Sequence, residues 1–121
     1  MVISENISGI KIPFVEKNIG ASLYAEITGT YNIELTDEKD LETIKSTVKN
    51  LVSMNITNVL YKELSEINGS YKEINIKELE EKIIKSIEEI GHNEFYRIIN
   101  ISLNDIELDE SSQKMLEMLK K

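Results

Sequence analysis

The sequence contains no cysteine and no tryptophan, and it has one proline, one histidine and five glycines. Without cysteine the chain has no disulfide framework, no zinc–thiolate site and no cysteine nucleophile. Only 14 basic residues accompany 22 acidic ones, which gives a formal net charge of -8. Proteins that neutralise phosphates need the opposite charge, so we predict that neither nucleic acid nor an anionic membrane surface is a direct partner.

The 121 residues are 40% apolar and 30% charged, which predicts one globular domain over residues 1–121. No window approaches the ~20 apolar residues of a membrane-spanning helix. The apolar residues of Met1–Ile12 are interrupted by Glu5, Asn6 and Gly9, so this segment does not have the pattern of a secretory signal. We therefore predict a cytoplasmic protein.

Two strands are expected in the first third of the chain. Apolar and polar residues alternate strictly over Ser22–Leu35, which is typical of a strand with one face in water. Gly29 interrupts this strand and predicts a bulge or a close approach of another backbone. Gly9–Phe14 predicts a shorter strand, and Pro13 favours a place at a sheet edge or a strand end.

A helical period follows, with Thr36 or Asp37 as the expected N-cap and Asn68-Gly69 as the expected end. The pattern weakens at Ser53–Asn55, which leaves two consecutive helices or one bent helix open. The next helix is predicted to start at Asn75, with Glu78 completing a capping box, and to end before Gly91.

Phe95–Leu103 predicts a further strand, and Asn104-Asp105 shifts its register as a bulge does. A short helix is expected from Asp109 to the end of the chain. The order β-β-α-α-α-β-α predicts an α+β fold, with a small antiparallel or mixed sheet that carries helices on one face. The residues expected on one face of this last strand are Phe95, Ile99, Ile101 and Leu103.

The sequence offers little for catalysis. His92 follows a helix in Gly91-His92-Asn93-Glu94, without any local pattern of a nucleophile and its base. There is no calcium-loop, phosphate-loop or nucleophile-elbow motif. We therefore predict no enzyme, no catalytic or metal-binding residues and no cofactor.

The last helix stands out because four large apolar residues fall within five positions. Both helical flanks of this segment are apolar, and together they are wider than one contact with a core can bury. Docking on the chain's own core and self-association are both open for this helix. The predicted interface residues are Met115, Leu116, Met118 and Leu119.

Ile12-Pro13-Phe14, the strand Gly29–Leu35 with the following Asp37, and the order of the elements up to Leu119 resemble SPFH domains, the band 7 superfamily of stomatin, prohibitin and flotillin. Within it, Leu60–Ile67 resembles the bacterial branch described as virion-core-protein-like. The resemblance spans residues 10–119 and implies a scaffold that forms homo-oligomers without catalytic activity. The family's N-terminal part and its coiled coil or zinc ribbon are missing, so the chain is expected to be a fragment or a minimal member. Any membrane proximity would come from sequence that is absent here.

Three functional hypotheses follow. The leading one is a non-enzymatic SPFH-like scaffold that self-associates through its last helix and a sheet edge. The alternative is a ligand- or peptide-binding module that uses the wet face of the long strand, at Tyr24, Thr28 and Asn32, or the edge near Ile10. The third is a hydrolase or metal-dependent enzyme, which requires Glu26 and Glu34 to converge with His92.

Overall fold

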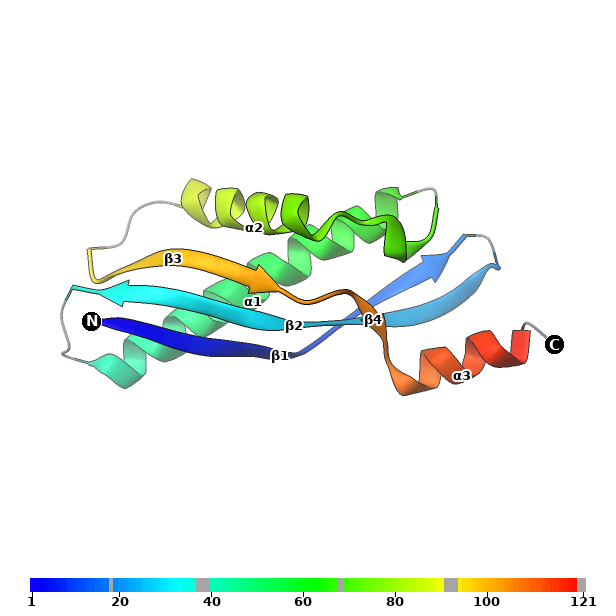
Figure 1. Cartoon of the computed structure of the whole chain (residues 1–121), viewed down its shortest axis with the longest axis horizontal. Coiled ribbons are helices and arrows are strands. Elements are labelled where there is room, and N and C mark those ends of the chain that lie inside the picture. Colours follow the sequence, from blue (N-terminus) through cyan, green and yellow to red (C-terminus); the bar gives the residue numbers. More distant parts are fainter. Residues whose placement is uncertain (18, 37–39, 68, 91–93, 120–121) are drawn as a thin grey trace.

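The structure is a computed structural model that describes residues 1–17, 19–36, 40–67, 69–90 and 94–119. Its sheet has four strands: β1 (Val2–Glu16), β2 (Ala21–Leu35), β3 (Tyr96–Leu103) and β4 (Glu107–Leu108). All pairings are antiparallel, and β2 lies between β1 on one side and β3 followed by β4 on the other. Figure 1 shows this long, narrow sheet.

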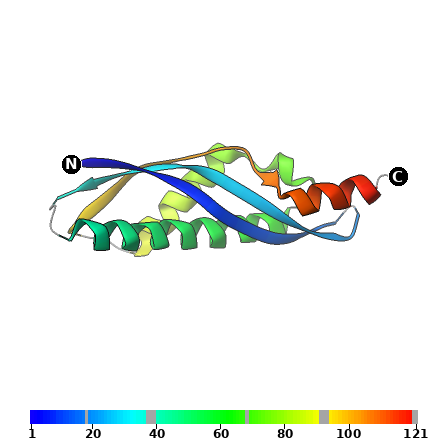
Figure 2. The ribbon, with the colours of Figure 1, turned by 90° about the horizontal axis from the view of Figure 1, so that it is seen from below.

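The helical elements are α1 (Leu41–Glu66), the 3-10 helix η1 (Tyr71–Glu73), α2 (Ile76–Ile90) and α3 (Glu110–Leu119). Figures 1 and 2 together show α1 and α2 on one side of the sheet, with α3 beyond β4 near the tip of the β1–β2 hairpin. The predicted α+β class, with an antiparallel sheet and the two long helices on one face, is confirmed.

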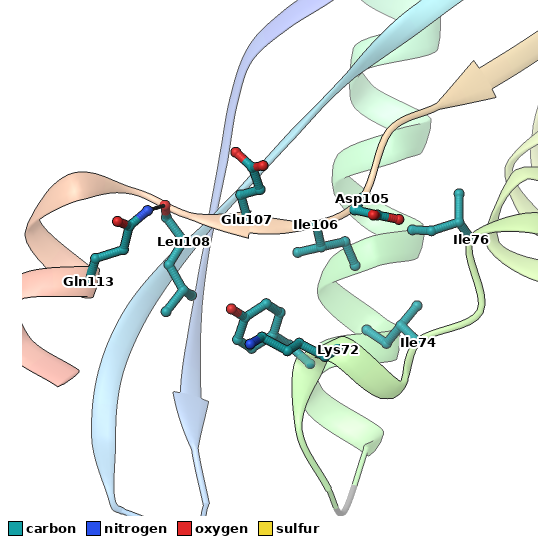
Figure 3. Close-up of a pocket in the computed structure, with 9 residues that line it drawn as sticks. Lys72, Ile74, Ile76, Asp105, Ile106, Glu107, Leu108 and Gln113 are labelled. Carbon is teal, nitrogen blue, oxygen red and sulfur yellow. Dashed lines mark hydrogen bonds between the residues drawn. The ribbon is translucent and has the colours of Figure 1, made fainter. Parts of the chain in front are cut away.

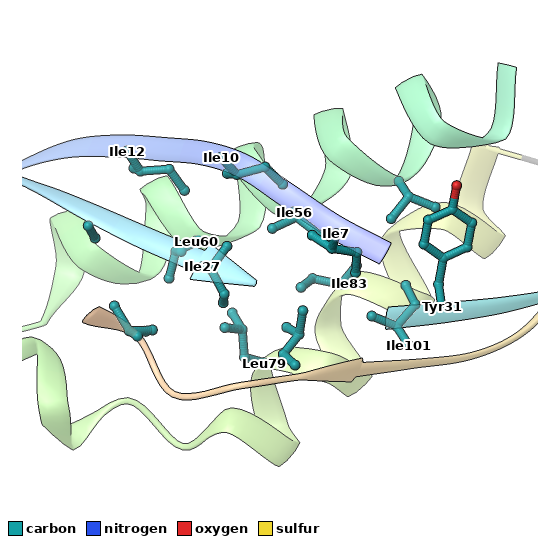
Figure 4. Packing of buried hydrophobic residues seen from close by; sticks show 14 of the residues in the cluster. Ile7, Ile10, Ile12, Ile27, Tyr31, Ile56, Leu60, Leu79, Ile83 and Ile101 are labelled. Atoms are coloured by element: carbon teal, nitrogen blue, oxygen red, sulfur yellow. The ribbon is translucent and has the colours of Figure 1, made fainter. Parts of the chain in front are cut away.

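The core forms between this face of the sheet and the two long helices, because each element turns its apolar side inward (Figure 4). Odd-numbered residues of β2 are buried from Leu23 to Leu35, with Gly29 the half-buried exception, which confirms the predicted alternation. Asn75 caps α2 as predicted, since its Oδ1 accepts the Glu78 N–H at 3.2 Å. The fully buried side chains include Ile12, Leu23, Ile27, Ile33, Ile56, Leu60, Leu79 and Ile83.

Both neighbours of β2 are irregular at the level of Thr28. On β1, Ser8 and Gly9 lie opposite this single residue, and Gly9 has a left-handed φ of 74°. On the other side, Asn104 donates its backbone N–H to the Thr28 carbonyl at 2.9 Å, between the paired segments of β3 and β4. The predicted bulge at Asn104 is confirmed, and so is the close backbone approach at Gly29, next to the Ser102 carbonyl.

The first strand is longer than the predicted Gly9–Phe14, because pairing with β2 continues on both sides of the bulge. The bulge changes which residues face the core, and this hides the alternation from a reading of the sequence. Pro13 does lie in an edge strand, as predicted.

Of the two alternatives left open at Ser53–Asn55, two consecutive helices is wrong, because α1 is one helix across this segment. Asn55 is buried on the core side of α1, where its amide donates to the Leu51 carbonyl at 2.7 Å and its Oδ1 accepts the Ser86 hydroxyl at 2.6 Å. These bonds satisfy a polar group that the helix buries, so the apolar stripe is interrupted without the helix being interrupted.

The N-cap predicted at Thr36 is also wrong. Helix α1 starts at Leu41, and the Thr36 hydroxyl donates to the Glu94 carbonyl at 2.6 Å. Asp37, Asn68 and Gly91, named for helix ends, lie outside the described residues, as does His92.

One face of β3 was predicted incorrectly at its start. Phe95 and Ile99 are exposed, whereas Ile101 and Leu103 are buried. The register shifts because Asn100 pairs with Asn32 while Ile98 pairs with Ile33, so Ile99 is an extra residue in β3. The inward-facing parity therefore changes within the strand.

Candidate functional site

The start of α3 is held against the edge of β2. The Asp109 N–H donates to the Tyr24 carbonyl at 3.1 Å, and the Tyr24 N–H donates to the Ser112 hydroxyl oxygen at 2.8 Å. The Ser112 N–H in turn donates to Asp109 Oδ1 at 2.8 Å, which is an N-terminal cap for this helix. Hydrogen bonds from Ser112, followed by the charge of Lys11, lower the pKa of the Asp109 carboxyl.

Beyond this first turn, α3 contacts the body of the protein mainly through one apolar side chain. Leu116 is half-buried and packs against the core. Met115, Met118 and Leu119 remain 43%, 75% and 54% exposed, and we call these three residues the α3 apolar face. Of the four predicted interface residues, one is therefore engaged within the chain and three are on the surface. This division matches the expectation that one contact with the core cannot bury both apolar sides of the last helix.

A groove of about 550 Å³ runs between η1 and β4 (Figure 3), and we call it the η1–β4 groove. Tyr71 lines it, and the rings of Tyr71 and Phe14 meet in an edge-type contact with their centroids 5.9 Å apart. Burial, together with the charges of Glu16 and Glu107, raises the pKa of the Tyr71 hydroxyl, so this group is neutral at physiological pH. The lining residues are Tyr71, Lys72, Ile74, Ile76, Asp105, Ile106, Glu107, Leu108 and Gln113.

A second hollow, of about 420 Å³, lies over the irregular region of the sheet. It contains Thr28 but neither Tyr24 nor Asn32, the other two residues predicted for a binding surface. Its lining is mostly hydroxyl and amide side chains, and Asn32 is bonded to Ser4 and Asn100 instead. The hollow over the described sheet face is therefore polar, whereas an apolar pocket lined by Tyr24, Thr28 and Asn32 would favour the ligand-binding hypothesis.

The carboxylates named for an enzyme do not converge. Glu26 and Glu34 lie eight residues apart on β2, a separation of about 26 Å at about 3.3 Å per residue. Each pairs with a cation, since Glu34 lies 2.9 Å from Arg97 and Glu26 lies 3.4 Å from Lys11, which also pairs with Asp109 at 3.8 Å. Within the described ranges, no three His, Cys, Asp or Glu side chains gather as a metal site would require. His92 lies outside these ranges.

The groove was not predicted from the sequence. The parity change before Ile106 and Leu108 indicated a bulge, but nothing local indicates that this segment faces Tyr71, more than 30 positions earlier in the chain. No helix in the described part of the chain is long and apolar enough to cross a membrane. Comparison with models of known protein families and with curated proteins gives no match for this chain.

Proposed function

We propose that this protein is a non-enzymatic scaffold module that associates with copies of itself through the α3 apolar face. The observation that carries the proposal is the division of α3 into a docked flank at Leu116 and an exposed flank at Met115, Met118 and Leu119. Exposed apolar side chains that gather on one helix face, rather than scatter singly, are typical of interaction surfaces.

The SPFH resemblance remains part of this proposal. It rests on the order of elements, with a long hairpin followed by two helices, a strand and a terminal helix with an acidic start. A scaffold role also accords with the two carboxylates named for an enzyme, since Glu26 and Glu34 each pair with a cation instead of converging. We propose no enzymatic activity and no cofactor for this chain.

The charge of the chain sets the conditions for a test. A net charge of -8 makes two copies repel each other, and added salt screens this repulsion within about 10 Å at 0.1 M. We therefore expect self-association to strengthen as the salt concentration rises. Association driven by ion pairs alone would weaken instead.

The experiment is sedimentation equilibrium over about 10 μM to about 1 mM protein, a range that detects weak association. The native chain is expected to exceed the monomer mass, and Met118→Asp to weaken association more than tenfold because a carboxylate replaces a buried contact. Met54 provides a matched control, since it is 54% exposed and lies on α1 rather than on α3. The variant Met54→Asp adds the same charge and should associate like the native chain.

The proposal fails if the native chain is a monomer over the whole range, or if both variants lose association equally. Circular dichroism of each variant checks that the fold is retained. Leu116→Asp is a poorer test, because Leu116 packs against the core and its replacement also lowers stability.

A further inference from the structure

We infer that the η1–β4 groove receives the α3 apolar face of a second copy, so that the molecules join head to tail. This inference rests on the proposed self-association and adds the surface that α3 meets. The groove has an apolar floor formed by side chains such as Ile74, Ile76 and Ile106, which is a suitable counterpart for methionine and leucine side chains.

The groove and the α3 apolar face lie on opposite sides of the same helix. Gln113 is the α3 residue that lines the groove, and its amide donates to the Leu108 carbonyl at 2.7 Å (Figure 3). At about 100° per residue, Met115, Met118 and Leu119 are centred nearly opposite Gln113 around α3. A chain therefore cannot fill its own groove with its own α3 apolar face.

This arrangement also determines how copies combine. If the two surfaces faced the same way, a two-fold dimer could satisfy both at once. Because they face opposite ways, each copy offers α3 to one neighbour and its groove to another, which is a heterologous contact. Assembly by this contact continues beyond two molecules unless one of the two surfaces is removed.

The charges beside the two surfaces are complementary. Lys114 flanks the α3 apolar face on the side of Met118, and its ion pair among the described residues is the exposed one with Glu110 at 3.2 Å. Such exposed pairs contribute little to stability, so Lys114 can turn toward a partner at small cost. The groove carries Asp105 and Glu107 on its β4 side and Lys72 on its η1 side, so acidic groups outnumber basic ones in its lining. This pairing of charges favours a second copy as the occupant.

The test mixes two variants, each with one surface disabled. Met118→Asp removes the α3 apolar face and keeps the groove. Ile76→Glu places a charge in the groove and keeps α3. Ile76 packs in part against the core, so this change also lowers stability, but Ile76 is the first residue of α2, where an acidic side chain is favourable. Each variant alone is expected to be monomeric, whereas an equimolar mixture forms a 1:1 complex that stops at two chains.

A second measurement does not depend on the apolar substitutions. Asp105→Lys is expected to weaken association about threefold, Lys114→Glu by a similar factor, and the double variant to recover most of the loss. Both positions are exposed, so neither change should affect folding.

The outcomes separate this inference from the proposed function. If Ile76→Glu associates as the native chain does, while Met118→Asp does not, α3 meets another surface and the inference is wrong although self-association stands. A mixture that stays monomeric, with both variants folded, also overturns the inference. A native chain that is monomeric at all concentrations overturns both.

Discussion

Replacing Gly29 with alanine is expected to force β3 away from β2. An added Cβ at Gly29 would lie 3.0 Å from Leu103 Cα and 3.1 Å from Ser102 C, and closer still to the Ser102 carbonyl oxygen. Carbon atoms in ordinary contact are about 3.5–4.0 Å apart, so the β3 backbone must move by between about 0.5 and 1 Å. Because the neighbours are main-chain atoms within a paired strand, no rotamer change relieves the overlap.

The magnitude follows from this displacement. Overpacking of this kind costs about 1–3 kcal/mol, and a stretched hydrogen bond in the β2–β3 ladder adds about 1 kcal/mol. Alanine also restricts the conformations of the unfolded chain, which offsets about 0.4–1 kcal/mol of this loss of stability. The net loss is about 2 kcal/mol, and for a domain of this size the melting temperature should fall by about 8 °C.

Gly69 offers a matched control. An added Cβ there would lie 2.7 Å from Glu73 Cδ and 2.9 Å from its Oε1, but these atoms end a flexible side chain on an exposed residue. Neither glycine has a left-handed φ. Gly69→Ala is therefore expected to leave the melting temperature unchanged or slightly higher. Calorimetry of both variants checks the reasoning, which is refuted if Gly29→Ala melts at or above Gly69→Ala.

Two further predictions concern buried and capping polar groups. Asn55→Ala should destabilise the fold by about 1–3 kcal/mol, and Ser86→Ala should destabilise it by less. Because the two side chains share one hydrogen bond, the double variant should lose less stability than the sum of the two single losses. Additive losses in urea unfolding would contradict this. The pKa of Asp109 is lowered by Ser112 and then Lys11, so its carboxylate stabilises the folded state above the unfolded pKa, near 3.8, and this contribution is lost as pH falls through the folded pKa. Asp109→Asn should therefore lower stability at neutral pH. It should also make the melting temperature fall less steeply between about pH 5 and about pH 2, and an unchanged pH dependence would be evidence against the cap.

Local sequence patterns predicted an element correctly where its apolar residues keep one spacing throughout. β2 alternates along 15 residues, and the apolar stripe of α2 follows Asn75 directly, so both were predictable from spacing and capping. The failures fall where the chain departs from its period. The extra residue at Ile99 and the pair at Ser8-Gly9 each shift the inward parity, and only the paired strand reveals the shift.

The candidate site was predictable in part for a similar reason. An apolar excess in α3 can be read from four residues in five positions, but which of them docks depends on where α3 meets the sheet. Leu116 is selected because Ser112, one turn earlier, is bonded to Tyr24. The η1–β4 groove has no local signal at all, since its walls come from segments far apart in the sequence. Tertiary packing, not composition, creates it.

The sheet edges help to explain why association is expected through side chains rather than by strand addition. The β1 edge carries the Gly9 bulge and Pro13, both of which oppose pairing with another strand. On β3 the Leu103 N–H already donates to Glu80 Oε2 at 2.7 Å. On β4 the Leu108 carbonyl already accepts a hydrogen bond from the Gln113 side-chain amide. A partner strand would have to displace these groups at each edge. An apolar helix face that enters the groove displaces none of them and buries surface that the fold leaves exposed, which is why we propose α3 rather than a sheet edge as the route to assembly.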